Sequence, residues 1–430
     1  MNSIIPEKYN FFKDYNIIFF LFFSFCLGNV FINLATLICF VIFIIRFKEV
    51  KFYINQLSTL FYLLLFFWFI LILSTLINDH KNFKLILKSI AYVRFIILPF
   101  VIIYMITKVD KKKFIIFINF LIIFLIFDVL FQFYFKFDVF GYHLKDLGNA
   151  RQDRISGFFG QELVAGSYLT LFGFLSLFLI SETEIFKNKR HLYFIYLFIL
   201  ITAIIITGDR VSIILIFGIF LFNLIFNKKI RKYLLYLFLI YLFFVTLLIK
   251  SSDKLSYRYI ENIKSITNID APKQLSIKNF LNTPWAAHYL VSIEMIKDQP
   301  ILGYGNKGFR KNCSKYTQKK NLPHYVNKIA YQHYGCANHP HNTYFEIIVE
   351  TGFLGLIVFV IFNFIIFFKV LRKKTTLLIL IYSIIFTILN PFRPTGSFFS
   401  TWSASSYWVI LGILFYFLVK KYNEKKYELK

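Results

Sequence analysis

Residues able to do acid–base chemistry gather in one short stretch, HPHNTYFEIIVETGFLG, which begins at His339. Histidine titrates near neutral pH, so His341 can take a proton from an attacking hydroxyl group. A helix begun near His341 places Asn342, Glu346 and Glu350 on one face, because they lie four residues apart. Either histidine alone could be an ordinary loop residue at a membrane interface. The cluster with two carboxylates instead favours His341 as a catalytic residue, with His339, Asn342 and Glu346 binding substrate.

Arginines form the second set of candidates, because a guanidinium group is permanently charged and makes forked hydrogen bonds to phosphate oxygens. The segment RQDRISGFFGQELVAG holds Arg151 and Arg154, and the short turn TGDRVS holds Arg210. We expect Arg154 and Arg210 to act in catalysis on a pyrophosphate group, and Arg151 and Arg258 to bind substrate. Arg393 is a weaker candidate. The alternative is that these arginines reach toward the membrane surface or pair with nearby aspartates.

A third segment, KDQPILGYGNKGF, begins at Lys297 and has three glycines after a proline. This pattern predicts a turn-rich connection. A phosphate-binding loop is conceivable, but the glycine spacing follows no Rossmann strand, so a dinucleotide site is rejected.

Four cysteines divide into two pairs by their surroundings. Cys26 and Cys39 lie in apolar stretches and are most simply packing residues. Cys313 and Cys336 lie in a long polar connection, where an oxidising compartment would allow a disulfide. Their spacing relative to the nearby histidines fits no standard zinc pattern, so we predict no metal site.

The composition indicates a membrane protein. Of the 430 residues, 58% are hydrophobic, whereas soluble domains hold about 45–50% apolar residues. The formal net charge of +27 would suggest a nucleic-acid partner in a soluble protein. Lysines also collect on the cytoplasmic side of membrane helices. No soluble domain is evident in this chain, so nucleic-acid binding is excluded.

Twelve apolar segments are candidates to cross a bilayer, which takes about 20 residues per helix. They cover 15–28, 30–45, 57–77, 90–107, 114–135, 163–181, 192–207, 211–226, 233–249, 353–368, 376–390 and 406–419.

The charges between these segments set the orientation. A basic cluster follows every even-numbered segment, as in Lys111, Lys112 and Lys113, whereas the short odd-numbered connections carry few charges. Both termini are therefore expected in the cytoplasm. The N-terminus lacks a small-residue cleavage site and is not expected to be a cleavable signal peptide.

The predicted fold is an all-α integral membrane protein with about 12 transmembrane helices and one large periplasmic loop containing short helices. Residues 1–249 carry transmembrane helices 1–9, residues 250–341 form the loop, and residues 342–430 carry helices 10–12. The stretch from Trp285 has helical spacing of apolar residues and could lie on the membrane surface as an amphipathic helix. The loop is also rich in lysine, which suits anionic lipid or a phosphorylated substrate, or only a lysine-rich proteome.

Together these segments resemble the O-antigen ligase and polymerase superfamily of bacterial envelope glycosyltransferases. The ligase pattern is His, then Asn, Ser or Gln, nine residues and Gly-x-x-Gly, and it is matched by His341-Asn342 followed by Gly352 and Gly355. RISGFFGQELVAG looks like the Arg-x-x-Gly segment of this superfamily. TGDR looks like its Thr-x-Ser-Arg turn, with Asp209 where Ser is usual, and QPILGYGNKGF looks like its Pro-x-x-Gly-x-Gly segment. The superfamily often has an arginine shortly before that last segment; here His288 is the nearest polar candidate for substrate binding.

The resemblance implies a donor glycan on undecaprenyl pyrophosphate and a lipid A–core or glycan acceptor, at the periplasmic face of the bacterial inner membrane. It implies transfer with inversion and without a metal or other cofactor. In that chemistry His341 orients or deprotonates the acceptor hydroxyl, and Arg154 and Arg210 neutralise the departing pyrophosphate. The donor and the membrane lipid are the expected partners.

Several activities fit these residues. A ligase acting on lipid A–core is the leading hypothesis, followed by a polymerase that joins lipid-linked repeat units, and then by a protein O-glycosylating enzyme. A transporter or flippase is less favoured, because it predicts ionisable residues in mid-span. Asp128 is the clearest such residue here, and hydrogen-bonded packing explains it equally well.

Overall fold

The computed structural model describes residues 13–78, 82–144, 154–183, 189–261, 283–318 and 328–427. These residues form helices joined by mostly short connections, and the described part of the chain contains no β-strand. The prediction of an all-α protein is therefore confirmed.

The described residues of the first half of the chain form nine α-helices, two short 3₁₀ helices (η2 and η5) and one π-helical turn (η6). They are η2 (Asp14–Asn16), α1 (Ile17–Leu27), α2 (Asn29–Ile45), α3 (Phe47–Gln56), α4 (Ser58–Ile77), α5 (Phe83–Ala91), α6 (Val93–Lys108), α7 (Lys111–Phe135), η5 (Gly157–Phe159), α8 (Ala165–Tyr168), η6 (Leu169–Gly173) and α9 (Phe174–Ile180).

The second half contains the remaining described helices. They are α11 (Arg190–Ile206), α12 (Arg210–Phe226), α13 (Arg231–Lys250), α14 (Asp253–Ser256), η7 (Tyr257–Glu261), α17 (Pro284–Asp298), α18 (Gly308–Thr317), α19 (Lys328–Tyr334), α20 (Thr343–Lys373), α21 (Thr376–Ile388) and α22 (Thr401–Tyr427).

Each predicted apolar segment is helical, but the helices differ in length. By length and composition, six among the described residues are long and apolar enough to cross a membrane, or seven if α2 and α3, bent by 93°, count as one span. Five further apolar helices have 10–17 residues. The chain thus has the helices of a multi-pass membrane protein, whereas the count of twelve spans stays a prediction.

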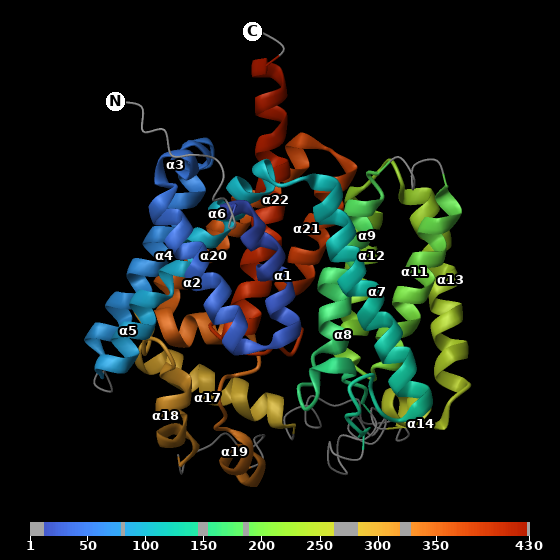
Figure 1. Ribbon diagram of the computed structural model, residues 1–430. Helices are drawn as coiled ribbons and strands as arrows, with labels where there is room; N and C mark the ends of the chain where they lie inside the picture. Colours follow the sequence, from blue (N-terminus) through green and yellow to red (C-terminus); the bar gives the residue numbers. More distant parts are fainter. Residues whose placement is uncertain are drawn as a thin grey trace.

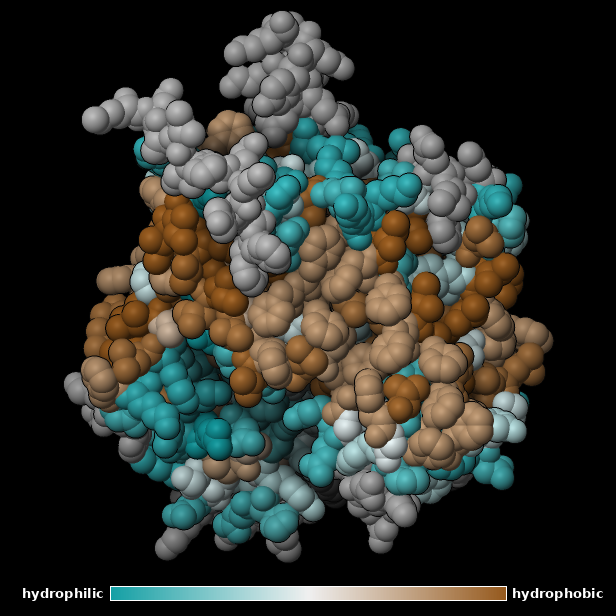
Figure 2. Space-filling view, in the orientation of Figure 1, coloured by the Kyte–Doolittle hydropathy of each residue, from teal (hydrophilic) through white to brown (hydrophobic). Residues whose placement is uncertain are grey.

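The bundle has two distinct ends. Figure 1 shows α17, α18 and α19 at one end, and α3 with the C-terminal part of α22 at the other. In Figure 2, apolar residues form a belt around the middle of the visible face, with hydrophilic residues gathered above and below it. Exposed apolar side chains such as Phe120 and Phe243, both above 60% exposed, need an apolar surrounding. This arrangement fits helices that cross a bilayer.

Within the predicted 250–341 loop, the described helices α17, α18 and α19 form a cap. Val291 and Met295 of α17 pack with Phe309 of α18, Tyr331 of α19 and Val349 of α20 in a small core of their own. The helix expected from Trp285 therefore exists as α17. Its buried face contacts the neighbouring cap helices and α20, which the amphipathic pattern alone did not reveal.

A disulfide closes this cap. The structure joins Cys313 of α18 to Cys336, which follows α19. Cys336 lies three residues before His339, so the link fixes the chain as it approaches the start of α20.

Candidate active site

His341 lies immediately before α20 in a backbone conformation that few residues adopt. Its φ angle is 55°, in the left-handed region that is costly for a residue with a side chain. Asn342 then caps the helix, since its Oδ1 accepts hydrogen bonds from the backbone N–H groups of Tyr344 and Phe345 at 2.9 and 3.2 Å. The cap fixes where α20 begins and holds His341 at its mouth.

Three histidine rings meet at this position. The ring of His341 lies 4.1 Å from that of His339 and 5.1 Å from that of His288, centroid to centroid. Burial disfavours the imidazolium form. It lowers the pKa of His288 and of His339 to about 4, and it also lowers the pKa of His341. At neutral pH the rings are therefore uncharged, and His341, which is only half-buried, can accept a proton.

The connection between α21 and α22, residues 389–400, holds this segment in place. His339 Nε2 lies 3.1 Å from the carbonyl oxygen of Thr395, whose N–H donates to the carbonyl of His341 at 2.8 Å. Asn342 Nδ2 donates to the carbonyl of Pro391 at 2.6 Å. The predicted site and the 389–400 connection thus form one hydrogen-bonded unit.

Glu346, one turn into α20, is bonded to the same connection. One of its carboxylate oxygens accepts from Ser397 Oγ, and the other accepts from the backbone N–H of Phe398 at 2.6 Å. Asn342 and Glu346, which we predicted to bind substrate, therefore use these polar atoms to hold the 389–400 connection.

The glycine-rich turn after α17 packs into a break in α20. At Gly352 the helix departs from helical geometry, with φ 66° and ψ −174°. There the N–H groups of Phe353 and Leu354 donate to the carbonyls of Pro300 and Ile301 at 2.8 and 3.3 Å. A Cβ atom on Gly352 would lie 1.9 Å from the oxygen of Ile301. Among the described contacts, the glycines of this segment thus serve close backbone packing.

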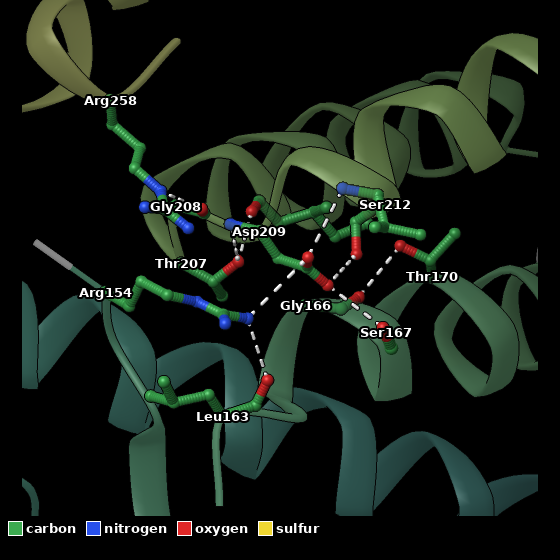
Figure 3. Close-up of polar contacts among 12 residues, drawn as sticks. Arg154, Leu163, Gly166, Ser167, Thr170, Thr207, Gly208, Asp209, Ser212 and Arg258 are labelled. Carbon is green, nitrogen blue, oxygen red and sulfur yellow. Dashed lines mark hydrogen bonds and ion pairs between the residues drawn. The ribbon is translucent and has the colours of Figure 1, made fainter. Parts of the chain in front are cut away.

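Two of the predicted arginines converge on the turn between α11 and α12 (Figure 3). Arg154 Nη2 donates to the carbonyl of Leu163 at 2.9 Å and lies 3.6 Å from Asp209 Oδ1. Arg258 Nε donates to the carbonyl of Gly208 at 3.0 Å. Arg210 is the first residue of α12, directly after Asp209. The structure therefore brings Arg154 and Arg258 to the turn that Arg210 follows in the chain, and we call these three residues the arginine cluster; Arg151 lies outside the described residues.

Asp209 organises this arginine cluster. Its Oδ2 accepts hydrogen bonds from Ser167 at 2.9 Å and from Ser212 at 2.7 Å, beside the contact with Arg154. A Cβ atom on Gly166 would lie 2.5 Å from Cβ of Asp209, so only glycine allows this approach. The departure from Ser at position 209 was visible in the sequence, but its role as the centre of the cluster was not.

Arg393 connects the two clusters. It lies in the 389–400 connection, and its Nε and Nη1 are buried with no hydrogen-bond partner among the described residues. Burial lowers the pKa of Arg393 to about 10, while the charge of Asp209 acts in the opposite direction. Buried N–H groups of a guanidinium that have no acceptor are costly, and an anion bound to them would remove that cost. From the sequence alone, Arg393 was only a weaker candidate for binding the pyrophosphate group.

The structure also bears on metals. Among the described residues, no group of three or more His, Cys, Asp and Glu side chains is arranged to hold a metal ion. The expectation that the site works without a metal or cofactor stays a prediction.

Comparison with known proteins bears on this geometry. A family model described as O-antigen ligase matches residues 195–360. This match assigns the segment to the O-antigen ligase superfamily. The matched part runs from α11 through Asp209 and the cap to Gly355, so it holds the histidine cluster and part of the arginine cluster. The superfamily predicted from the motifs is thereby confirmed. A search of curated proteins found no match to this chain.

Proposed function

We propose that the protein is an inverting, metal-independent glycosyltransferase that moves a polysaccharide from undecaprenyl pyrophosphate to a lipid A–core acceptor. One observation carries the proposal. The 389–400 connection bonds the His339–Asn342 segment and also carries Arg393, whose charge interacts with Asp209 in the arginine cluster. These interactions support a site in which a proton acceptor and an anion-binding region act together at one end of the bundle. We further propose that this end faces the periplasm, with both termini in the cytoplasm.

The residues divide the reaction between them. His341 takes the proton of the acceptor hydroxyl, whose oxygen bonds to the anomeric carbon of the donor sugar. The bond from that carbon to the pyrophosphate oxygen breaks, and its electron pair leaves with undecaprenyl pyrophosphate. Attack opposite the leaving group inverts the anomeric centre. Arg154, Arg210 and Arg393 neutralise the charge that develops on the pyrophosphate.

A groove between α11, α12 and α13 supports a lipid-linked donor. It has a volume of about 550 Å³ and an apolar lining. Leu197, Ile201 and Phe220 form a buried floor, and Phe198 and Ile240 form an exposed rim. α11 and α12 meet at the turn of the arginine cluster. A hydrocarbon chain in this groove and a pyrophosphate at those arginines therefore lie on the same helices, as one amphiphilic donor requires.

Deletion of the gene, followed by gel analysis of the lipopolysaccharide, tests the proposal. For a ligase we expect loss of all polymer on lipid A and accumulation of long lipid-linked chains. Core capped with a single repeat unit would instead identify a polymerase. An unchanged lipopolysaccharide profile would contradict both activities.

A further inference from the structure

Five cationic side chains gather beside the candidate active site without a carboxylate in ion-pair distance among the described residues. Lys84 and Lys88 belong to α5, Lys307 immediately precedes α18, and Arg310 and Lys311 lie in the first turn of α18. The charges of the other four all act on Lys88. None of the five forms a salt bridge within the part of the chain that the structure describes. Repulsion between these like charges calls for an anionic ligand.

The same part of α5 has an apolar face. Phe83, Leu87 and Ile90 follow helical spacing and are 75%, 47% and 44% exposed. Leu85 and Ser89 point the other way and are buried. A basic row beside an exposed apolar row is the pattern of a surface that binds an anionic lipid, with the hydrocarbon against one row and the headgroup against the other. We call these eight residues the α5–α18 surface.

Specific contacts fix the two halves of this surface against each other. The N–H of Asn306 donates to Thr75 Oγ1 of α4 at 3.0 Å, and Thr75 Oγ1 lies 2.9 Å from Ser89 Oγ of α5. A crevice of about 10 Å³, lined among others by Leu85 and Lys311, separates α5 from α18. The cations are therefore held in one place by the fold.

The surface continues into the candidate active site. The charge of Lys307 acts on His339, Glu346 and Glu350, and the backbone of Lys307 hydrogen-bonds the carboxylate of Glu350. In Figure 2 a recessed hydrophilic area lies below the apolar belt, between the places of α5 and α17 in Figure 1. A headgroup bound at the α5–α18 surface thus lies next to the histidine cluster. The arginine cluster and the apolar groove belong to other helices.

We propose that the α5–α18 surface binds the phosphorylated headgroup of the acceptor glycolipid and presents its sugar to His341. This inference rests on the proposed function and adds the place where the acceptor binds. Donor and acceptor then approach the histidine cluster from different helices, α11–α13 and α5–α18. A phosphorylated glycolipid fits better than a free glycan, because a free glycan has no use for the apolar row.

Steady-state kinetics of the full chain in nanodiscs test the proposal, with the donor and the acceptor varied separately so that each KM is measured. Each lysine near a membrane surface contributes about fivefold to the binding of an anionic lipid. The variant K84Q/K88Q should therefore raise the KM for bisphosphorylated lipid A–core about 30-fold and leave the KM for the donor unchanged. The matched control K112Q/K113Q removes two lysines at the start of α7 and should change neither constant. If K84Q/K88Q folds poorly, R310Q/K311Q serves in its place and should raise the KM for lipid A–core in the same way.

Direct binding separates this inference from the proposed function. Wild-type protein should bind lipid A–core vesicles more tightly than vesicles of the dephosphorylated glycolipid or of phosphatidylglycerol, and K84Q/K88Q should lose that preference. Equal binding to phosphatidylglycerol would overturn the acceptor site in favour of general attraction to lipid. An unchanged KM for the acceptor in both K84Q/K88Q and R310Q/K311Q would also overturn the acceptor site. Wild-type protein that binds lipid A–core but transfers no glycan would contradict the proposed function instead.

Discussion

At the scale of single residues, His341 combines two features that rarely occur together. Its backbone is strained, with φ at 55°, and burial among His288 and His339 lowers its pKa. The strain persists because the hydrogen bond from Thr395 to the His341 carbonyl and the cap at Asn342 hold the backbone at this turn. An uncharged ring at a fixed position is what a general base requires.

We expect His341→Gln to reduce transfer by about 100-fold or more, since a positioned base contributes about 10²–10⁴. Membrane levels should stay unchanged, and His333→Gln, an exposed histidine in α19, serves as the control. Because burial lowers the pKa of His341, wild-type activity should persist below pH 6.5, the ordinary histidine value, and then fall as the ring gains its proton. Full activity of His341→Gln would remove this residue from the mechanism.

Arg393 is the second residue with a distinct prediction. Removing a charge-assisted contact to the leaving group costs about 1.5–3 kcal/mol, so Arg393→Gln should lower kcat about 10- to 100-fold. Arg393→Lys should restore part of that loss, because it keeps the charge without the forked geometry. Initial rates at saturating donor and acceptor measure both effects. If Arg393 only packs the connection, the thermal unfolding temperature will fall while the kcat of the folded protein stays unchanged.

At the scale of elements, the site depends on segments that dock backbone to backbone. The Pro300–Gly305 turn fills the break of α20 at Gly352, and the N–H of Ile155 donates to the carbonyl of Thr207 at 3.0 Å beside the arginine cluster. Where the Pro300–Gly305 turn meets α20, a Cβ atom on Gly303 or Gly352 would collide with the facing backbone. This close approach explains why both positions are glycine.

The matched pair Gly352→Ala and Gly28→Ala tests this packing. Both glycines have a positive φ with ψ near 180°, but a Cβ atom on Gly28 meets nothing within 4 Å. Gly28→Ala should cost only backbone strain, about 1–3 kcal/mol. Gly352→Ala adds the collision with Ile301 and should exceed about 4 kcal/mol. Thermal unfolding in detergent measures both; equal losses would show that the docking at Gly352 is dispensable.

At the scale of the whole molecule, the bundle separates its chemistry by end. The cap, the histidine cluster and the turn between α11 and α12 with its arginine cluster lie at one end of the bundle, whereas the basic start of α7 follows α6 at the other end. An apolar belt lies between the two ends (Figure 2). Under the proposed function, the donor lipid reaches the candidate site laterally from this belt.

Single cysteines report which end faces outward. A membrane-impermeant maleimide applied to spheroplasts should label Ser251→Cys, which lies between α13 and α14 at the same end of the bundle as the cap. It should not label Lys112→Cys at the start of α7 until the cells are lysed. Mass spectrometry of the purified protein measures both positions. Labelling of Lys112→Cys in intact spheroplasts would reverse the proposed orientation.

The sequence by itself determined the apolar helices, the superfamily motifs and the residue types of the candidate site. Those properties follow local spacing, so they can be seen one segment at a time. Only the tertiary structure revealed that His288 contacts His341, that Asp209 centres the arginine cluster and that the 389–400 connection joins both clusters through Arg393. Contacts between segments far apart in the chain leave no periodic pattern in the sequence. The reason is that the residues between the two segments do not depend on which side chains meet.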